Sequence, residues 1–219
     1  MPELPEVETI KRGLEKTIVG KKIGSVEVRL PKIVSIGPAV VSNIRKNSSA
    51  KVKKFRQLAA NHKIMAVKRR AKMLMLDLSG PFTILVHLKM TGQLIFAKKR
   101  EKKIVKILNA ANSRKELLPH KYTHVIFTFS DGSRLYFNDL RQFGYMRLVP
   151  DDDLARVREL AEYGPEPDAL EFTAQYLIDK AKTRPKLAVK QFLMDPKVAA
   201  GIGNIYPAPS RIPRSLLRG

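Results

Sequence analysis

Short apolar runs of strand length recur through the first two-thirds of this 219-residue chain and decide its fold class. They cover residues 22–30, 62–67, 72–79, 82–88 and 93–97. Residues 124–139, HVIFTFSDGSRLYFND, contain two further runs around Asp131-Gly132, a dipeptide typical of a tight hairpin turn. Helical periodicity is missing from about residue 21 to residue 149. The pattern predicts a mostly antiparallel β domain.

The stretch before these runs, which begins MPELPEVETI, predicts a helix. Val7, Ile10, Leu14 and Ile18 recur at helical spacing, and Gly20 is suited to end the helix.

The composition changes sharply after residue 150. Residues 151–171 hold eight acidic residues against two basic ones, with Pro165 and Pro167 close together, which indicates one helix followed by a linker. Residues 172–184 and 186–199 look helical. We therefore predict an α+β fold in two domains, residues 1–150 and residues 151–219.

The charge of the chain indicates an anionic partner. Lys and Arg total 42 against 20 acidic residues, a formal net charge of +22, and no acidic residue lies between Glu27 and Asp77. Such an excess attracts polyanions, so nucleic acid is the first expectation, ahead of a membrane surface or an acidic protein. The alternative is a solvated basic face with no partner.

The composition also excludes several classes of protein and of site. The chain has no cysteine, which excludes disulfides and thiolate metal sites. No apolar run is long enough to span a bilayer, and the first residues carry acids where a signal peptide has bases. We expect a soluble intracellular protein with no membrane partner.

The first residues allow two interpretations. Pro2 and Glu3 suit the first turn of a helix, where proline is tolerated and the helix dipole favours a carboxylate. Alternatively, removal of Met1 makes Pro2 a free secondary amine beside a carboxylate. An α-amine has a pKa near ~8, so part of it is a neutral nucleophile that can attack a sugar C1′. Glu3 would then act as a general acid or base.

Three other segments are candidate binding sites. Lys68, Arg69, Arg70 and Lys72 stand at the entry to a strand, as a phosphate clamp or a solvated strand end. HLKMTGQL and NDLRQFGYM follow strands, and they place Met90, Arg141 and Phe143 on loops, where apolar wedges can enter a duplex. Met and Phe at strand ends are more often core residues.

A glycine-containing turn, GIGNIY, offers Asn204 and backbone amides at the start of a helix, which is a possible anion site. The segment lacks the full dinucleotide-binding and P-loop patterns, so neither is inferred.

Taken together, six segments occur in a specific order: MPELPEVETI, RRAKMLML, HLKMTGQL, FNDLRQFGYMRL, GPEPDAL and KQFLMDPKVAAGIGNIY. From residue 1 to residue 206 the chain resembles the formamidopyrimidine-DNA glycosylase/endonuclease VIII family of base-excision repair enzymes, and more closely its formamidopyrimidine-DNA glycosylase branch. The resemblance implies an N-terminal helix packed on a β-sandwich, then a helical domain with a helix–two-turn–helix motif, with DNA bound between them.

The resemblance also implies a monomeric protein of the bacterial cytoplasm or nucleoid that acts on damaged double-stranded DNA. Members remove oxidised purines such as 8-oxoguanine and formamidopyrimidines, and then cut the strand by β,δ-elimination. By position in the motifs, Pro2 would be the Schiff-base nucleophile and Glu3 the proton donor. Lys72 would contact phosphate and assist the chemistry, and Glu6 would lie near the active site.

The remaining matched residues would bind DNA. Met90, Arg141 and Phe143 correspond to the trio that fills the gap left by a flipped nucleotide, with Arg141 facing the orphaned base. Asn204 corresponds to an asparagine that binds backbone phosphate. His87 is also predicted to bind DNA.

The sequence departs from the family after GIGNIY. Members continue with a second helix and a four-cysteine zinc finger, whereas here PAPSRIPRSLLRG follows, and Pro207 and Pro209 disfavour a helix. We therefore expect no cofactor and no metal site in this chain, and weak or absent activity. A non-catalytic DNA-binding protein is the alternative. A ribosomal or RNA-binding protein would explain the charge but not the ordered motifs.

A smaller departure is Lys89, where the family commonly has glycine. We expect the lysine to be tolerated if its side chain points outward.

Overall fold

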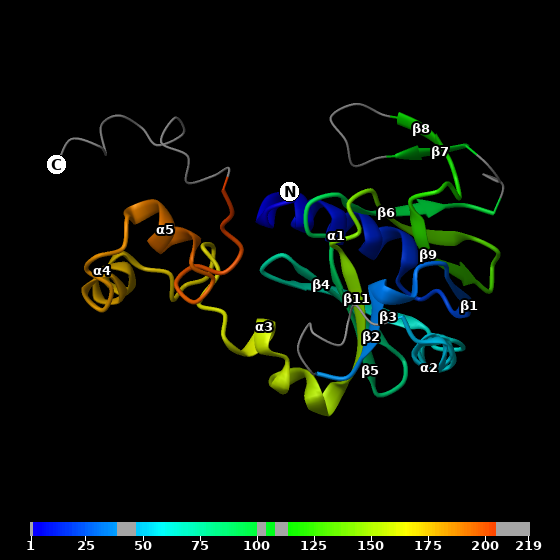
Figure 1. The fold of residues 1–219 in the computed structure, drawn as a ribbon, viewed down its shortest axis with the longest axis horizontal. Coiled ribbons are helices and arrows are strands. Elements are labelled where there is room, and N and C mark those ends of the chain that lie inside the picture. The colour runs from blue at the N-terminus through cyan, green and yellow to red at the C-terminus, as the bar shows by residue number, and fades with distance from the viewer. Residues whose placement is uncertain (1, 39–46, 100–103, 108–113, 205–219) are drawn as a thin grey trace.

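The computed structural model describes residues 2–38, 47–99, 104–107 and 114–204 (Figure 1). The helices are α1 (Leu4–Ile18), α2 (Ser49–Ala59), α3 (Arg158–Ala161), α4 (Ala174–Lys182) and α5 (Val189–Met194), with 3₁₀ turns η1 (Pro31–Ile33) and η3 (Asp151–Arg156). The strands are β1 (Ile23–Val28), β2 (Val34–Ile36), β3 (Ile64–Arg70), β4 (Met73–Leu78), β5 (Phe82–His87), β6 (Gly92–Ala97), β7 (Ile104–Ile107), β8 (Arg114–Leu117), β9 (Thr123–Phe129), β10 (Arg134–Asp139) and β11 (Tyr145–Pro150).

Two sheets form a sandwich. One has the strand order β1-β9-β10-β6 and the other β2-β11-β5-β4-β3, while β7 and β8 form a separate pair. The strands of the sandwich pair antiparallel, apart from the parallel pair of β2 and β11. Val125 and Phe127 of the first sheet share one buried apolar core with Leu74 and Met146 of the second. The fold is α+β, as predicted.

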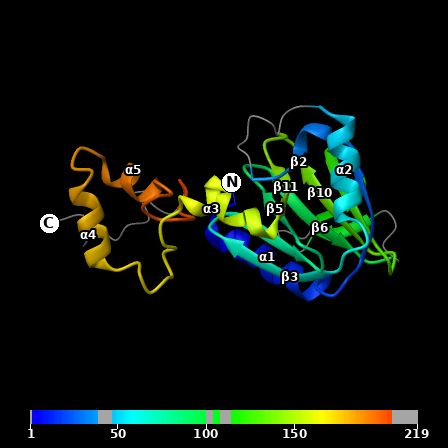
Figure 2. The same ribbon diagram turned by 90° about the horizontal axis from the view of Figure 1, so that it is seen from below.

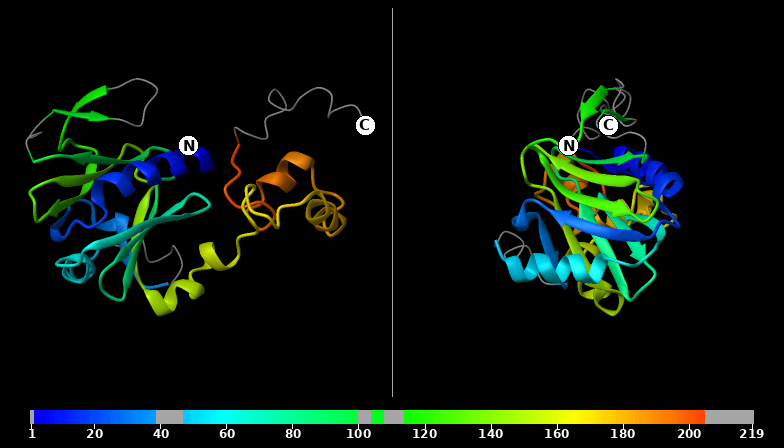
Figure 3. Two further views of the ribbon diagram at one scale, coloured as in Figure 1. Left: turned by 180° about the vertical axis from the view of Figure 1, so that it is seen from behind. Right: turned by 90° about the vertical axis from the view of Figure 1, so that its right-hand side faces the viewer.

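Two helices cover the open sides of this sandwich. α1 packs on β3 and β6, the edge strands of the two sheets on one side, and α2 packs on β1 and β2, the edge strands on the other. Figures 2 and 3 show α1 and α2 on opposite sides of the strands. Because an exposed strand edge can pair with another chain, this arrangement protects the sheets from edge-to-edge association.

The N-terminal helix agrees with the sequence prediction. α1 buries Val7, Ile10, Leu14 and Ile18, and these are the four residues that gave the helical spacing. Gly20 follows the helix with a φ of +81°, a left-handed conformation that glycine adopts without steric cost.

The prediction that residues 21–149 lack a helix is wrong. Ser48 caps α2 by accepting a hydrogen bond from the Lys51 N–H at 3.2 Å, and Phe55 and Ala59 of α2 are fully buried. The density of Lys and Arg in SAKVKKFRQLA hides this short apolar stripe. Strands β2, β7, β8 and β11 also lie outside the apolar runs identified in the sequence.

After residue 150 the described chain forms helices and no strand. The acidic stretch contains η3 and α3 and then a non-helical segment, and α4 and α5 lie in the two segments predicted to be helical.

Ion pairs join this helical region to the sandwich. Arg69 of β3 bonds Glu8 of α1 at 2.9 Å and Glu166 at 2.6 Å, and the Ala71 N–H donates to Glu166 Oε1 at 2.6 Å. The Arg70 guanidinium donates to the backbone carbonyl of Gly164 at 2.8 Å. The N-terminal half of α1 is therefore held beside the helical region, as Figure 1 shows.

Candidate active site

The side chain of Glu3 lies at the junction of the two regions. Glu3 is the N-cap residue of α1 and is only 1% exposed. Its Oε2 accepts a hydrogen bond from the Gly203 N–H at 3.2 Å, across 200 residues of sequence. A Cβ at position 203 would stand 2.4 Å from the Glu3 carboxyl carbon, so glycine is required for this approach. The contact fixes the carboxylate between the sandwich and the helical region.

Lys72 lies close to this carboxylate. It belongs to the two-residue turn between β3 and β4, in which Ala71 has a φ of +53°. The Lys72 ammonium donates to the Ile202 carbonyl at 2.9 Å, next to the residue that binds Glu3. Burial lowers the pKa of Lys72, and the nearby charge of Glu3 opposes that change. The turn and the N-terminus thus bring an amine and a carboxylate to one place.

Pro2 and Glu6 complete the N-terminal group. Pro2 is half-buried and directly precedes Glu3. The Glu3 N–H donates to Glu6 Oε2 at 2.9 Å, which makes Glu6 a residue that orients the start of α1. Both interpretations of the first residues are compatible with this geometry, since Glu3 begins the helix and also faces the junction.

His87 is the last residue of β5 and lies close enough to Lys72 to be affected by its charge. Its ring packs 5.6 Å from the ring of Tyr145, and its Nδ1 accepts a hydrogen bond from the Lys89 N–H at 3.0 Å. Burial lowers the pKa of His87 to about 3, and the charges of Lys89 and Lys72 contribute to the shift. His87 is therefore neutral at physiological pH, with its proton on Nε2.

Replacing His87 with glutamine should make folding less sensitive to acid. Because the pKa of His87 falls from 6.5 in the unfolded chain to about 3 in the folded one, the unfolded chain binds more protons between these values. Its contribution to stability is therefore lost as the pH falls from 6.5. Urea unfolding at about pH 7 and pH 5 should show a smaller loss of stability in the variant. An equal loss in both proteins would contradict this assignment.

Met90, Arg141 and Phe143 lie on two neighbouring loops, as predicted. Met90 and Phe143 are each 43% exposed, which excludes the alternative that they are core residues. The Arg141 guanidinium stacks 4.9 Å from the Phe143 ring centroid. The three side chains are available to an external partner.

Asp139 holds these two loops together, a role that the sequence did not reveal. Its Oδ2 accepts the Gly144 N–H at 2.7 Å, and its Oδ1 accepts the Thr91 hydroxyl. Thr91 Oγ1 in turn accepts the Arg141 N–H at 2.9 Å. The loop bases are therefore rigidly connected while their tips are exposed.

The basic stretch at residues 68–72 does not behave as one unit. Arg69 is bound by the carboxylates of the junction, and Lys68 pairs with Asp77 at 2.6 Å on the surface. Lys72 interacts with the charge of Glu3. The sequence could not distinguish these roles, because the partners of Arg69 are distant along the chain.

Asn204 is exposed and is the last residue that the structure describes. The helix expected after it lies outside the described residues.

Lys89 does not point freely outward. It has a φ of +50°, which explains why glycine suits this position, and its ammonium lies 5.7 Å from the ring centroid of Tyr145. Its side chain is half-buried and its charge reaches Lys72 and His87. Lys89 therefore does not meet the condition for a tolerated lysine, which was a side chain that points outward.

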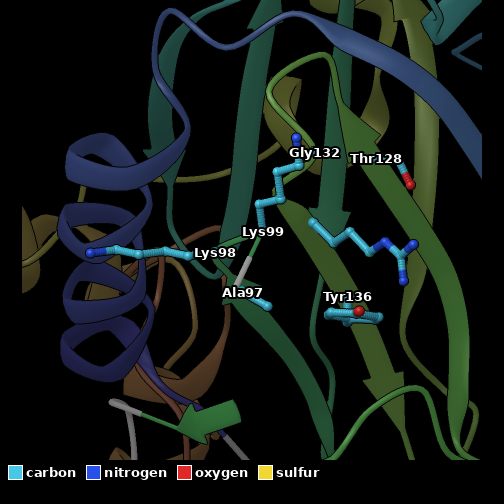
Figure 4. Close-up of a pocket in the computed structure, with 7 residues that line it drawn as sticks. Ala97, Lys98, Lys99, Thr128, Gly132 and Tyr136 are labelled. Carbon is cyan, nitrogen blue, oxygen red and sulfur yellow. The ribbon is translucent and has the colours of Figure 1, made fainter. Parts of the chain in front are cut away.

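A separate cavity of about 400 Å³ lies on the sheet formed by β6, β9 and β10 (Figure 4). Lys98, Lys99, Arg134 and Tyr136 help to line it, and Lys98 and Lys99 extend in different directions. The described residues that line it include no carboxylate or imidazole and none of the group around Glu3. We therefore assign no chemistry to it.

The described residues offer neither a metal site nor a membrane-spanning helix. They contain no group of three or more His, Cys, Asp or Glu side chains that could hold a metal ion, and the sequence has no cysteine, so they do not fit a four-cysteine zinc site. Within the same residues, no helix is both long and apolar enough to cross a membrane.

Two solved structures of DNA complexes are similar to this chain. The formamidopyrimidine-DNA glycosylase of Lactococcus lactis, non-covalently bound to DNA containing an AP site, aligns with a TM-score of 0.72 and 28% identity, covering 94% of this chain and 66% of that one. MutM in complex with DNA containing carbocyclic 8-oxo-G aligns with a TM-score of 0.72 and 30% identity over the same shares.

The sequence gives the same relationship. The family model of the formamidopyrimidine-DNA glycosylase N-terminal domain matches residues 1–146. The formamidopyrimidine-DNA glycosylases of Carboxydothermus hydrogenoformans and Pelotomaculum thermopropionicum are 43% and 38% identical over 206 residues, which is 94% of this chain. The chain thus belongs to the formamidopyrimidine-DNA glycosylase family. It spans 63% and 64% of the length of these two relatives.

Proposed function

We propose that the chain carries the catalytic site of a DNA glycosylase that removes oxidised purines and then cuts the abasic strand by β,δ-elimination. The observation that carries this proposal is the buried Glu3 carboxylate, held by the Gly203 N–H next to Pro2 and close to Lys72. Membership in the family supports oxidised purines as the substrates, namely 8-oxoguanine and formamidopyrimidines in duplex DNA.

The Pro2 nitrogen acts as the nucleophile once Met1 is removed. Its attack on C1′ forms a C–N bond and breaks the glycosidic bond, whose electrons leave with the damaged base; the base takes up a proton and the nitrogen loses one. The nitrogen lone pair then breaks the C1′–O4′ bond, so that the sugar ring opens and O4′ takes up a proton. The iminium ion formed in this way acidifies the C2′ hydrogens. Loss of one of them expels the 3′ phosphate, and a second elimination expels the 5′ phosphate.

Glu3 and Lys72 assist these steps. Glu3 gives and takes protons at the reacting sugar, because a buried carboxylate beside the nucleophile is in reach of the atoms that change protonation. The Lys72 ammonium contacts a backbone phosphate and stabilises the negative charge that develops as the strand is cut.

The two exposed loops allow the nucleotide to leave the helix. C1′ cannot be attacked inside a stacked duplex, so the nucleotide must be flipped out, at a cost of a few kcal/mol. Met90, Arg141 and Phe143 replace part of the lost stacking, with Arg141 opposite the orphaned base. The net charge of +22 supplies sequence-independent affinity for DNA. His87 and Asn204 also bind the DNA. We propose that the protein acts as a monomer of two domains divided at residue 150.

A strand-cleavage assay tests this function. The chain should cut a duplex that contains 8-oxoguanine, at the low rate expected from the departure after GIGNIY, and leave the matched guanine duplex intact. Binding of both duplexes without cleavage would instead identify a non-catalytic DNA-binding protein and would refute the proposal.

Replacing Gly203 with alanine is expected to lower the excision rate by about 10²-fold, because displacement of a catalytic group by about 1 Å has an effect of that size. The new methyl group would overlap the Glu3 carboxyl group and push it from its position. Gly13→Ala is the matched control, since a Cβ there has open space. Excision rates under single-turnover conditions measure the effect, and equal rates for the two variants would contradict the assigned position of Glu3.

A further inference from the structure

Lys89 occupies a position that is unfavourable for a lysine. It lies in the turn between β5 and β6, directly before Met90, with a left-handed φ of +50°. A side chain with a Cβ is strained in this conformation, whereas glycine is not. A residue that keeps such strain suggests a function for its side chain.

The surroundings of the ammonium add a second unfavourable contribution. The side chain is half-buried over the ring of Tyr145, and burial lowers the pKa of Lys89. Glu159 attracts the ammonium from a distance, but its carboxylate is bound by Arg147 at 3.1 Å and by the Tyr145 hydroxyl at 3.2 Å. Within the described part of the chain, Lys89 therefore forms no ion pair.

A second buried amine faces the same region. Met73 pairs with His87 across β4 and β5, so Lys72, directly before Met73, and Lys89, two residues after His87, lie at the same end of these strands. The charge of Lys89 is one of the causes that lower the pKa of Lys72, as expected for two ammonium groups that repel each other. Lys72 donates to a neutral carbonyl, that of Ile202. Two half-buried cations that repel each other are stabilised when an anion binds between them.

We propose that Lys89 and Lys72 form a clamp of two ammonium groups for one phosphate of the DNA strand bound in the site. A backbone phosphate has the charge to offset the repulsion, and it also has several acceptor oxygens for both lysines. The clamp fixes the sugar to which that phosphate is attached beside Pro2 and Glu3. Lys89 is thus a binding residue of the site, in addition to the residues assigned above.

His87 fits this arrangement. The Lys89 N–H donates to His87 Nδ1, which keeps the ring proton on Nε2 and makes Nε2 a hydrogen-bond donor. Because His87 stays neutral, it does not add a third charge to the repulsion. The backbone of Lys89 therefore orients one donor while its side chain supplies another.

The inference deepens the proposed function and rests on it for the identity of the strand. The first test measures binding by fluorescence anisotropy to a duplex with a tetrahydrofuran abasic-site analogue, over about 50–200 mM salt. Lys89→Gln and Lys89→Gly should bind several-fold more weakly. The slope of log K against log salt should become less steep, by at most about 0.9, the value for a whole phosphate contact, because Lys72 still contacts the same phosphate.

Matched variants distinguish the loss of a phosphate contact from a general loss of positive charge and from unfolding. Lys54→Gln removes one charge from the exposed surface of α2 and should leave the slope unchanged. Lys89→Gly also relieves the left-handed backbone, so its melting temperature should equal or exceed that of the parent chain. An unchanged slope in both Lys89 variants would overturn the proposal.

A second probe needs no DNA. Inorganic phosphate, at the same ionic strength as a chloride control, should shift the side-chain NMR signals of Lys72 and Lys89 together, and Lys89→Gly should abolish the shift at Lys72. If phosphate moves both signals while lesion-containing DNA is never cut, the proposed function fails and the clamp stands. If phosphate moves neither signal, the clamp is overturned whatever the enzyme does.

Discussion

Replacing Glu3 with glutamine is expected to lower the rate of base excision by about 10³-fold, within the usual range for the loss of a general acid or base. The substitution removes the group that gives and takes protons but keeps an acceptor oxygen for the Gly203 N–H, so the fold and the junction should be preserved. Burial of the side chain leaves little space for water to replace its function. Single-turnover release of 8-oxoguanine measures the effect.

Glu15→Gln is the matched control for this experiment. It removes the same charge from the same helix, at a position that pairs with Lys11 on the surface. The control should excise at the rate of the parent chain, and both variants should bind an abasic-site analogue with similar affinity. Excision by Glu3→Gln within about tenfold of the control would exclude Glu3 as the proton-transfer group.

Replacing Arg69 with methionine is expected to destabilise the protein by about 3 kcal/mol, because removal of one partner from a buried ion pair leaves its carboxylates uncompensated. The Arg69 side chain is 8% exposed and lies between Glu8 and Glu166. The hydrogen bond from Arg69 is also the main cause that lowers the pKa of Glu8. Urea unfolding measures the loss.

The neighbouring residue provides a control in the same strand. Lys68 is 64% exposed and pairs with Asp77, so Lys68→Met should cost at most about 1 kcal/mol. Since Arg69 connects α1 to the segment around residue 166, its loss should also weaken the contact between Glu3 and Gly203. A change below about 1 kcal/mol in Arg69→Met would show that the ion pairs do not hold the junction.

Local patterns were enough to predict part of the fold. The spacing of four apolar residues specified α1 and its buried face, because a helix positions side chains by rules that act within a few residues. The same reasoning failed for α2, whose buried Phe55 and Ala59 are separated by charged residues. A short stripe among many lysines gives too weak a signal.

The chemistry of the site was visible in the sequence only as separate segments. Pro2, Glu3 and Lys72 could be proposed from their motifs, but their convergence depends on contacts made by Ile202 and Gly203, which are 130 and 200 residues away. Residues whose partners lie far along the chain were missed or misread. Arg69 looked like a solvated or phosphate-binding cation, because Glu166 is 97 residues distant.

Lys89 shows the same limit. From the sequence it was an added charge on a loop, and only the structure shows that its backbone is left-handed and that its ammonium lies over Tyr145.

The claim on which the rest depends is that the Pro2 nitrogen bonds covalently to the sugar. Borohydride should trap the chain on DNA that contains an abasic site, and tandem mass spectrometry should locate the deoxyribose adduct on the Pro2 nitrogen. Protein that retains Met1, verified by its intact mass, should form no such adduct because that nitrogen is then an amide. An adduct on a lysine such as Lys72, or equal trapping of the Met1-retaining protein, would contradict the assignment.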